Sequence, residues 1–432
     1  MLKVLGIGGA TALAGCSSGG GDSTDTEAPT DPGTEGGSTD TGTTEAGTES
    51  EETTEANREV SGDYISGRST DAQSLNFFGA AASDGESADR VNLCLDGAWA
   101  ITPDLEVFPL WADVSTEDGQ TYTVELRDNL QWGGDYGQMT ADDWVYMIQE
   151  VFQADENWAG YPNQGDWSRG GEPIPVEQTG DLTFEIQLPN VDPTFPLKPI
   201  MWGQFCMPRD LVEPYREEGD AEAFSQDEAV QTLSYAGNLG PYSFENWARE
   251  DEFVATRNED YYMREAEGVS EAWQGAPYFE SYTMSVIPEE STRLSALRTG
   301  EITSTGIPTT KVAQFENENN VNVNVAPQPY MSSLIYNQRA NGNFYEALRK
   351  IEVRQALARA VNKETIANEI LSGYATIAHT FQPQFSRWYS DENVQQTGVG
   401  EEYGADVARE MLEPALEDTP YTYEGDRVVD EN

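Results

Sequence analysis

The sequence predicts a mixed α/β fold divided into more than one domain. A chain of 432 residues is long enough for two or three domains with a large core. Apolar and polar side chains alternate over residues 121–127 and again over 181–188, which is the pattern of half-buried strands. Residues 353–361 instead place apolar side chains three and four positions apart, which predicts an amphipathic helix.

The stretch 103–152 shows how such elements follow one another. Gly119 lies in a tight turn before the strand at 121–127, and glycines keep residues 131–137 in a loop. Thr140 is a suitable helix N-cap with Asp143 as its capping-box partner. The order is therefore strand, hairpin, strand, turn and helix.

Two further helices are expected. Residues 89–99 should form one of them. In the other, Asn362 caps the start, Ile366 and Ile370 face inward, and Gly373 ends the helix.

The charge of the chain excludes one class of partner. Asp and Glu number 77 against 24 Lys and Arg, so the net charge is -53. Nucleic-acid binding requires a basic surface, so no nucleic acid is expected as a partner. The acidic residues are dispersed, which favours a halophilic, haloarchaeal-like surface over a local patch for cationic ligands. In molar salt, screening to about 3 Å makes such self-repulsion tolerable.

The inventory of reactive side chains is small. The only histidine is His379, and no motif around it supports a zinc site or a catalytic triad. We therefore expect no metal, no cofactor and no enzymatic activity. Cys94 and Cys206 are far apart in sequence. They could pair in an oxidising compartment or remain two buried free thiols.

The N-terminus predicts export. Residues 1–15 are apolar apart from Lys3, and the Leu-Ala-Gly that precedes Cys16 resembles a lipobox. The run is shorter than the ~20 residues of a spanning helix, so residues 1–16 are interpreted as a signal peptide with a lipid attached to Cys16. No twin arginine precedes it, which leaves the export route open. Residues 17–57 predict a disordered acidic Ser/Thr/Gly tether.

Several motifs resemble one protein family. Residues 110–112, 118–128 and 140–145 are similar to the signature of family 5 extracellular solute-binding proteins, the peptide, dipeptide and nickel receptors of ABC importers. The resemblance runs from about residue 64 to 412, through residues 238–244, 257–262, 291–302, 353–374 and 403–412. Family members normally continue well past this point, which predicts a C-terminally truncated or divergent short form.

The resemblance implies a two-lobed fold like that of periplasmic binding proteins, of the class II type, with an inserted extra subdomain. The implied boundaries are 58–100 and 230–325 for lobe I, 101–229 for the inserted subdomain, and 326–432 for an incomplete lobe II. The mechanism implied is hinge closure, in which the ligand contacts both lobes and shifts the population to the closed form.

The resemblance also suggests ligand-binding residues. Asp71 and Phe77 lie in a loop similar to the family's first-strand loop, although the usual proline is absent. Trp202 and Phe205 lie in a segment that forms the cleft wall in the family, and plain core aromatics are an equal alternative. Trp158 lies where some members place a cleft tryptophan.

The function that follows is a substrate-binding lipoprotein of an ABC transporter. It would act as a monomer on the outer face of the cytoplasmic membrane, bind peptides or a similar small solute, and deliver them to the permease subunits. A peptide is favoured over a nickel chelate. The alternative is a non-transport surface lipoprotein with a structural or adhesive role. A secreted hydrolase would need a nucleophile and a base, and no motif supplies either.

Overall fold

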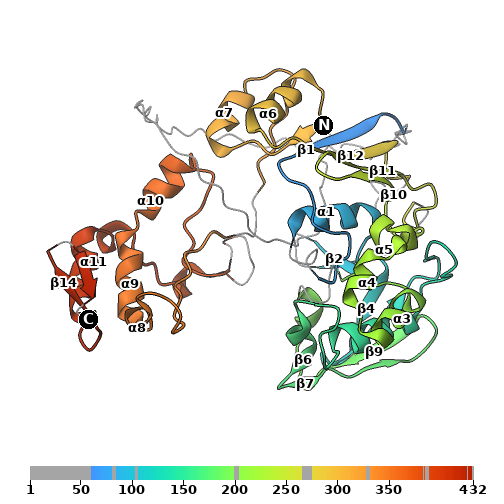
Figure 1. The fold of residues 1–432 in the computed structure, drawn as a ribbon, viewed down its shortest axis with the longest axis horizontal. Helices are drawn as coiled ribbons and strands as arrows, with labels where there is room; N and C mark the ends of the chain where they lie inside the picture. Colours follow the sequence, from blue (N-terminus) through green and yellow to red (C-terminus); the bar gives the residue numbers. More distant parts are fainter. Residues whose placement is uncertain are drawn as a thin grey trace, which may run out of the picture. The chain divides into compact units, whose positions relative to one another are not determined.

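The computed structural model describes residues 60–79, 84–102, 106–198, 204–264, 275–326, 331–382, 384, 389–425 and 427–430. The chain divides into two compact units, Met1–Glu290 and Ser291–Asn432. Helices and sheets occur in both (Figure 1). Each unit is described by itself.

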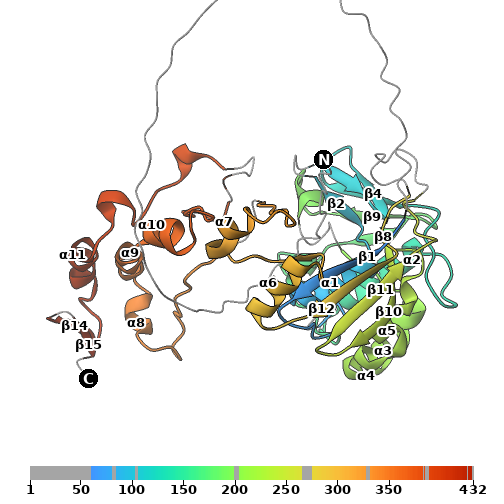
Figure 2. The ribbon, with the colours of Figure 1, turned by 90° about the horizontal axis from the view of Figure 1, so that it is seen from above.

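One sheet of unit 1 joins the first strand to a hairpin far along the chain. Strands β10 (Tyr242–Ala248), β11 (Glu252–Arg257), β12 (Ser281–Val286) and β1 (Asp63–Arg68) follow one another in that order (Figures 1 and 2). Strand β1 runs parallel to β12, and the other neighbours are antiparallel. Helix α1 (Gly85–Cys94) packs against β10 and β11. The order brings residues 63–68 beside residues 281–286, which no local pattern could show.

The second sheet of unit 1 forms around the predicted hairpin. Its strand order is β4 (Ala112–Ser115), β5 (Thr121–Leu126), β9 (Thr183–Gln187) and β8 (Val176–Gln178), all antiparallel. The predicted alternation is confirmed, because Tyr122, Val124 and Leu126 are buried and Glu125 is exposed.

Helix α2 (Ala141–Met147) starts where the sequence predicts, and continues as the π-helical turn Ile148–Phe152. The carboxylate of Asp143 accepts a hydrogen bond from the backbone N of Thr140 at 2.8 Å, as a capping box requires.

The remaining elements of unit 1 are short. They are β2 (Trp99–Ile101), β3 (Val107–Pro109), β6 (Ser168–Arg169), β7 (Glu172–Pro173), the helices α3 (Arg209–Glu218), α4 (Ala221–Gln226) and α5 (Glu228–Thr232), and 3-10 turns at Gln164–Trp167, Phe195–Leu197 and Ser234–Ala236. The helix expected at 89–99 is displaced, since α1 covers Gly85–Cys94 and Trp99 begins a strand. The N-cap that the sequence interpretation missed is Asp84, whose side chain accepts from the N of Ser87.

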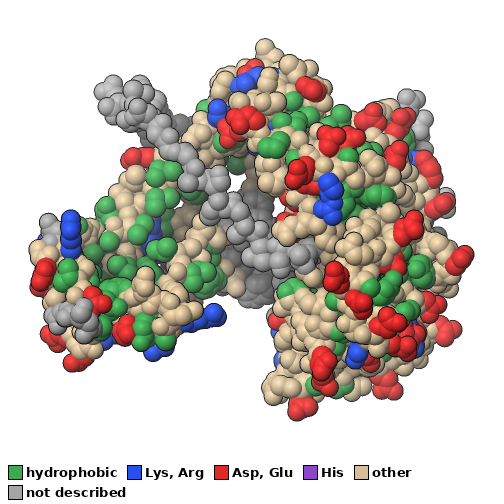
Figure 3. Space-filling view, viewed as in Figure 1, with side chains coloured by type: hydrophobic (Ala, Val, Ile, Leu, Met, Phe, Trp, Pro, Cys, Tyr) green, Lys and Arg blue, Asp and Glu red, His purple; other side chains and the backbone are tan. Residues whose placement is uncertain are grey.

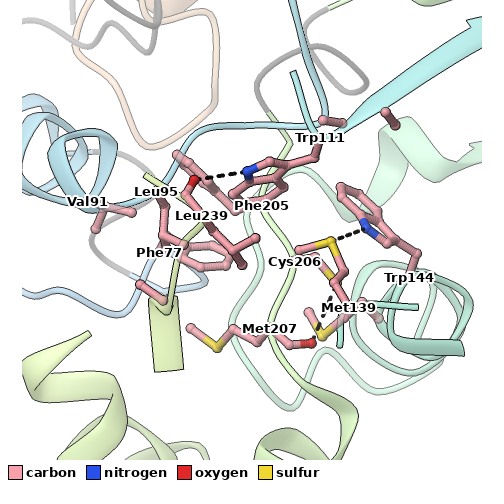
Figure 4. Packing of buried hydrophobic residues seen from close by; sticks show 14 of the residues in the cluster. Phe77, Val91, Leu95, Trp111, Met139, Trp144, Phe205, Cys206, Met207 and Leu239 are labelled. Atoms are coloured by element: carbon pink, nitrogen blue, oxygen red, sulfur yellow. Dashed lines mark hydrogen bonds between the residues drawn. The ribbon is translucent and has the colours of Figure 1, made fainter. Parts of the chain in front are cut away.

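A single apolar core joins the two larger sheets of unit 1. Val124 and Phe184 of one sheet and Phe253 and Met284 of the other belong to the same buried cluster. The indole of Trp111 is fully buried and donates to the backbone O of Leu239 at 2.9 Å (Figure 4). The predicted boundaries at 100, 229 and 325 stay predictions. The two sheets share one core, and the compact units divide after Glu290.

Unit 2 is mainly helical. Its elements are α6 (Glu290–Thr299), which starts at the boundary, β13 (Ser304–Thr305), α7 (Val312–Phe315), α8 (Tyr345–Leu348), α9 (Ile351–Ala360), α10 (Lys363–Thr365), the π turn Ile366–Ile370, α11 (Ala405–Ala415), and the hairpin β14 (Tyr421–Glu424) and β15 (Arg427–Asp430). It also has 3-10 turns at Thr309–Lys311, Asp391–Asn393 and Gly400–Glu402. Helix α9 packs on α11 around a small core that includes Val353, Ala356 and Leu412.

One expectation for unit 2 is wrong and two are confirmed. Ile366 and Ile370 were expected to face inward, but they are 40% and 60% exposed. The described part of unit 2 offers no apolar surface that covers this face of the turn. The predicted cap is present, since Asn362 accepts from the N of Thr365 at 2.9 Å. Gly373 has the positive φ, 78°, expected after a helix end.

Candidate functional site

Asp71, in the loop between β1 and α1, is at the centre of a hydrogen-bond network. Its carboxylate accepts from the backbone N of Ala72 at 2.8 Å and of Glu250 at 2.9 Å. It also accepts from the indole of Trp247 at 3.1 and 3.2 Å, and pairs with the fully buried guanidinium of Arg90 at 2.9 Å. Asp71 therefore ties its loop to α1 and to the β10–β11 hairpin.

These contacts keep the Asp71 carboxylate ionised. Desolvation raises its pKa, but the backbone bonds from Glu250 and Ala72, together with Trp247 and Arg90, outweigh that effect and lower the pKa overall. A carboxylate offers about four acceptor positions, and four donor groups occupy them. A ligand that contacts Asp71 must compete with these bonds.

Phe77 and Phe205 lie side by side in the structure. Their ring centroids are 4.9 Å apart, and Phe77 also contacts Phe78 at 4.4 Å. Phe205 lies 6.4 Å from Trp111 on its other side (Figure 4). Only 6% of Phe77 and 8% of Phe205 is exposed. In this structure the two rings thus contact other aromatic rings rather than solvent.

Trp158 is joined to this group only indirectly. Its ring is 5.9 Å from Phe224, and Phe224 is 6.0 Å from Phe78. The indole of Trp158 donates to the backbone O of Glu150 at 2.8 Å. Trp202 lies outside the described residues. The structure therefore brings Phe77 and Phe205 together, and places Asp71 and Trp158 in separate contacts.

Sequence reasoning missed the partners that hold these residues. Arg90 and Trp247 bind Asp71, and Gln204, just before Phe205, accepts from the hydroxyl of Tyr161 at 3.2 Å. An arginine within the helix predicted at 89–99, soon after a loop that contains an aspartate, was a usable signal for Arg90. The contact of Trp247 with Asp71 could not be predicted from the sequence, because it depends on the order of strands β10, β11, β12 and β1.

Two grooves on the described surface contain no predicted ligand-binding residue. One, of about 520 Å³, lies between α2 and α3 and is lined by four carboxylates, by Arg209 and Arg216, and by Tyr146. Its two arginines already pair with Asp142, Glu213 and Glu150. The other, of about 550 Å³, is a mostly apolar groove in unit 2 beside β14 and β15.

The predictions about metals and thiols can be compared with the described residues. In that part of the chain, no group of three or more His, Cys, Asp or Glu side chains is placed to hold a metal ion. Cys94 and Cys206 are both buried and unpaired, which answers the question that their spacing left open. Burial raises the pKa of both thiols.

Comparison with known proteins gives the family. Residues 106–423 match the model of "Bacterial extracellular solute-binding proteins, family 5 Middle". The chain belongs to this family. The family 5 match includes the sheet β4–β5–β9–β8, strands β10 to β12 and Phe205 of unit 1, and helices α9 and α11 of unit 2. Strand β1, Asp71, Phe77 and helix α1 precede the matched residues.

Curated relatives within family 5 are distant. The oligopeptide-binding protein AppA of Bacillus subtilis is 25% identical over 318 residues, which is 73% of this chain and 52% of the relative. The periplasmic oligopeptide-binding protein OppA of Salmonella typhimurium is 26% identical over 289 residues, which is 62% of this chain and 47% of the relative. The chain thus spans about half the length of the curated relatives it matches.

Solved structures confirm the fold. AppA from Bacillus subtilis, in complex with a nonapeptide, matches with a TM-score of 0.61 at 19% identity, over 86% of this chain and 68% of that one. NikZ from Campylobacter jejuni, in complex with Ni(L-His), matches with a TM-score of 0.60 at 21% identity, over 85% and 65%. The predicted α/β fold of two-lobed family 5 binding proteins is therefore correct. Within the described chain, no helix is both long and apolar enough to cross a bilayer.

Proposed function

We propose that the chain is the substrate-binding component of an ABC importer that takes up peptides or a similar small solute. The observation that carries this proposal is the family 5 match over residues 106–423. It favours transport over the alternative of a structural or adhesive surface lipoprotein. The family is one of solute-binding proteins, and this supports the expectation that the chain is not an enzyme.

Peptides are the preferred substrate class. AppA and OppA are named as oligopeptide-binding proteins, and the solved structure of AppA contains a nonapeptide. The similar structure of NikZ contains a nickel–histidine chelate, so a chelate is the competing ligand in any test. Capture would proceed by hinge closure, with the closed form presented to the permease subunits.

The proposed ligand contacts remain Asp71, Phe77, Trp158, Trp202 and Phe205. The packing of Phe77 against Phe205 supports an aromatic wall that could bury apolar side chains without strong sequence preference. A ligand would reach Asp71 only in competition with its present partners, because its acceptors are already occupied.

The location follows from the N-terminal sequence. We propose a lipid on Cys16, the tether 17–57 and a monomeric binding protein held at the outer face of the cytoplasmic membrane. Residues 1–57 lie outside the described part of the chain. The family description as extracellular agrees with this location. The predicted domain boundaries belong to the same proposal.

A thermal-shift experiment with scattering tests the proposal. The full chain in molar KCl is mixed with an oligopeptide pool, or with nickel and histidine as the competing arm. A peptide that binds only the folded protein should raise its melting temperature, by mass action, and should reduce the radius of gyration on closure. Trp202→Ala should weaken the shift, whereas Val191→Ala, at an exposed position away from the predicted contacts, should not.

If the peptide pool changes neither the melting temperature nor the radius of gyration, the non-transport alternative is favoured. A response to nickel and histidine alone would replace the peptide assignment.

A further inference from the structure

Asp96 lies where several crossing segments of unit 1 meet. It follows α1 by two residues, and its backbone N donates to the O of Leu239 at 2.9 Å. Its carboxylate accepts from the hydroxyl of Tyr261 at 2.7 Å and of Tyr262 at 3.0 Å. One carboxylate thus joins the chain that enters β2 to the chain that leaves β11.

The backbone around Asp96 is unusually close-packed. A Cβ atom at Gly240 would lie 2.1 Å from the backbone O of Cys94. A Cβ atom at Gly237 would lie 2.1 Å from the O of Gln131. Side-chain amides hold the same segments, because Asn258 donates to the O of both Gly237 and Gly240 at 2.9 Å. We call the meeting point of residues 94–98, 237–241 and 258–262 the junction.

The junction connects the two sheets of unit 1. Residues 94–98 lead from α1 to β2, which pairs with β3, and residues 237–241 lead into β10 of the sheet that contains β1. The backbone N of Tyr262 donates to the O of Asn238 at 3.2 Å, and the side chain of Asn129, just after β5, donates to the O of Tyr262 at 3.1 Å. A change in the packing of Asp96 therefore reaches both sheets.

The charge environment of Asp96 favours its protonated form. Desolvation by the surrounding protein raises the pKa of Asp96 to about 6, and the hydroxyls of Tyr261 and Tyr262 offset this only in part. Among the described residues, no lysine or arginine forms an ion pair with Asp96. Arg127 is the cation that faces the two phenols, and it donates to the backbone O of Leu110 and Pro109 instead. The segments of the junction also contain the thiol of Cys94, whose pKa is raised by burial, and the carboxylates of Glu259 and Asp260. Glu259 pairs with Arg257 and Arg264.

We propose that Asp96 is a proton-dependent switch, whose protonation tightens the junction between the two sheets of unit 1 and whose ionisation loosens it. The residue is half-buried, so protons can reach it from solvent. In the protonated state the carboxyl remains in hydrogen-bond contact with both phenols without carrying a buried charge. In the ionised state the same site holds a charge that the two phenol donors compensate only in part, which favours entry of water.

Comparison of the full-length protein with Asp96→Asn tests the switch, because asparagine keeps an acceptor oxygen and does not titrate. Melting temperatures are measured from pH 4.5 to 7.5 in molar KCl. The melting temperature of the wild type minus that of the variant should fall by on the order of 3 °C as the pH rises across this range. Because the carboxyl titrates near 3.9 in the unfolded chain and at about 6 in the folded protein, the change should be centred between these values, at about pH 5. The many other carboxylates cancel in this difference. A difference that does not change with pH, or that changes only below pH 4.5, would overturn the proposal.

A second variant and a second measurement test the switch even if Asp96→Asn does not fold. Tyr262→Phe removes one donor to the carboxylate, so it should move the midpoint of the pH profile upward by a few tenths of a unit or more. Amide exchange at Asp96 and Tyr262 should become faster above pH 6, after correction for intrinsic rates, while amides of β5 stay unchanged. The switch would be refuted if Tyr262→Phe did not move the midpoint of the pH profile and if amide protection at Asp96 and Tyr262 did not depend on pH.

Discussion

The indole of Trp247 donates a hydrogen bond to the carboxylate of Asp71 at 3.1 Å, although 176 residues separate the two in the chain. Arg90 on α1 pairs with the same carboxylate, and its side chain is fully buried. The contact thus holds the loop after β1, helix α1 and the β10–β11 hairpin together. A residue selected for ligand binding by its sequence context has a structural role in this protein.

We predict that Asp71→Ala destabilises unit 1 strongly. The substitution leaves the buried guanidinium of Arg90 with Glu86 as its remaining ion-pair partner, and loss of one partner of a buried pair costs about 3–5 kcal/mol. Urea unfolding in molar KCl measures the change. The control is Asp135→Ala, an exposed aspartate whose loss should change stability by less than about 0.5 kcal/mol. Equal effects of the two variants would refute the structural role of Asp71.

Phe205→Ala should also destabilise the fold, through a cavity rather than a charge. Phe205 packs between Phe77 and Trp111, and removal of a buried phenyl ring costs about 3–5 kcal/mol. Phe381→Ala is the matched control, since Phe381 is 87% exposed. The same urea experiment compares the two. A loss of peptide affinity in Phe205→Ala without loss of stability would instead show a ligand-contacting ring and contradict this prediction.

Local elements of the fold were predictable from sequence because they depend on neighbours in the chain. The alternation in β5, the Thr140–Asp143 capping box and the Asn362 cap each involve residues within a few positions of one another. The helix expected at 89–99 failed because the signal of its true N-cap, Asp84, was overlooked. The confirmed elements and the displaced helix thus both depend on side chains within a few positions of the helix or strand end.

The candidate site was less predictable because its contacts are not local. The pairing of β1 with β12 and the position of Trp247 depend on strand order, which no periodic pattern records. The same limitation applies to Ile366. Its spacing indicates a buried face, but burial also needs a partner surface, and none covers it within the described chain.

The single histidine predicts a local response to acid in unit 2. The Nδ1 atom of His379 accepts from the backbone N of Thr397 at 3.2 Å, and Lys363 donates to the O of Thr397. Desolvation, and then the charge of Lys363, lower the pKa of His379 below its usual 6.5. The folded protein therefore binds this proton less readily than the unfolded chain. The contribution to stability is present above pH 6.5 and is lost as pH falls from there toward the folded pKa.

Amide exchange measures this response at Thr397. Its protection factor should fall between pH 7.5 and 5 in the wild type. In His379→Gln it should stay constant, because glutamine offers an acceptor that does not titrate. Constant protection in the wild type would show that the histidine bond does not hold this loop.

The dispersed carboxylates predict a requirement for salt. Acidic side chains are scattered over the surface of both units in Figure 3, and lysines and arginines are few. Their mutual repulsion acts over about 30 Å at 0.01 M salt but only about 3 Å at 1 M. The melting temperature of the wild type should therefore rise from dilute buffer to molar KCl. A melting temperature that does not depend on salt would contradict the halophilic interpretation.

Unit 2 should open before unit 1. Its buried cluster is small, with Val353, Ala356 and Leu412 among its few members, whereas the core of unit 1 joins two sheets. Large exposed apolar side chains are also concentrated there, including Leu334 at 70% and Ile335 at 86%. Apolar burial contributes roughly 25 cal/mol per Å², so a unit with less of it has less free energy to oppose local opening.

Hydrogen exchange of the full chain in molar KCl tests this order. Amides of α9 and α11 should exchange at a lower denaturant concentration than those of β5, β11 and β12. A hydrophobic dye should bind the native protein, and replacement of Ile335 by serine should reduce its fluorescence without changing exchange in unit 1. Replacement of Val191, an exposed valine in unit 1, by serine is the control. If all these helices and strands open together, the two units unfold as one cooperative body, and the larger core stabilises the smaller one.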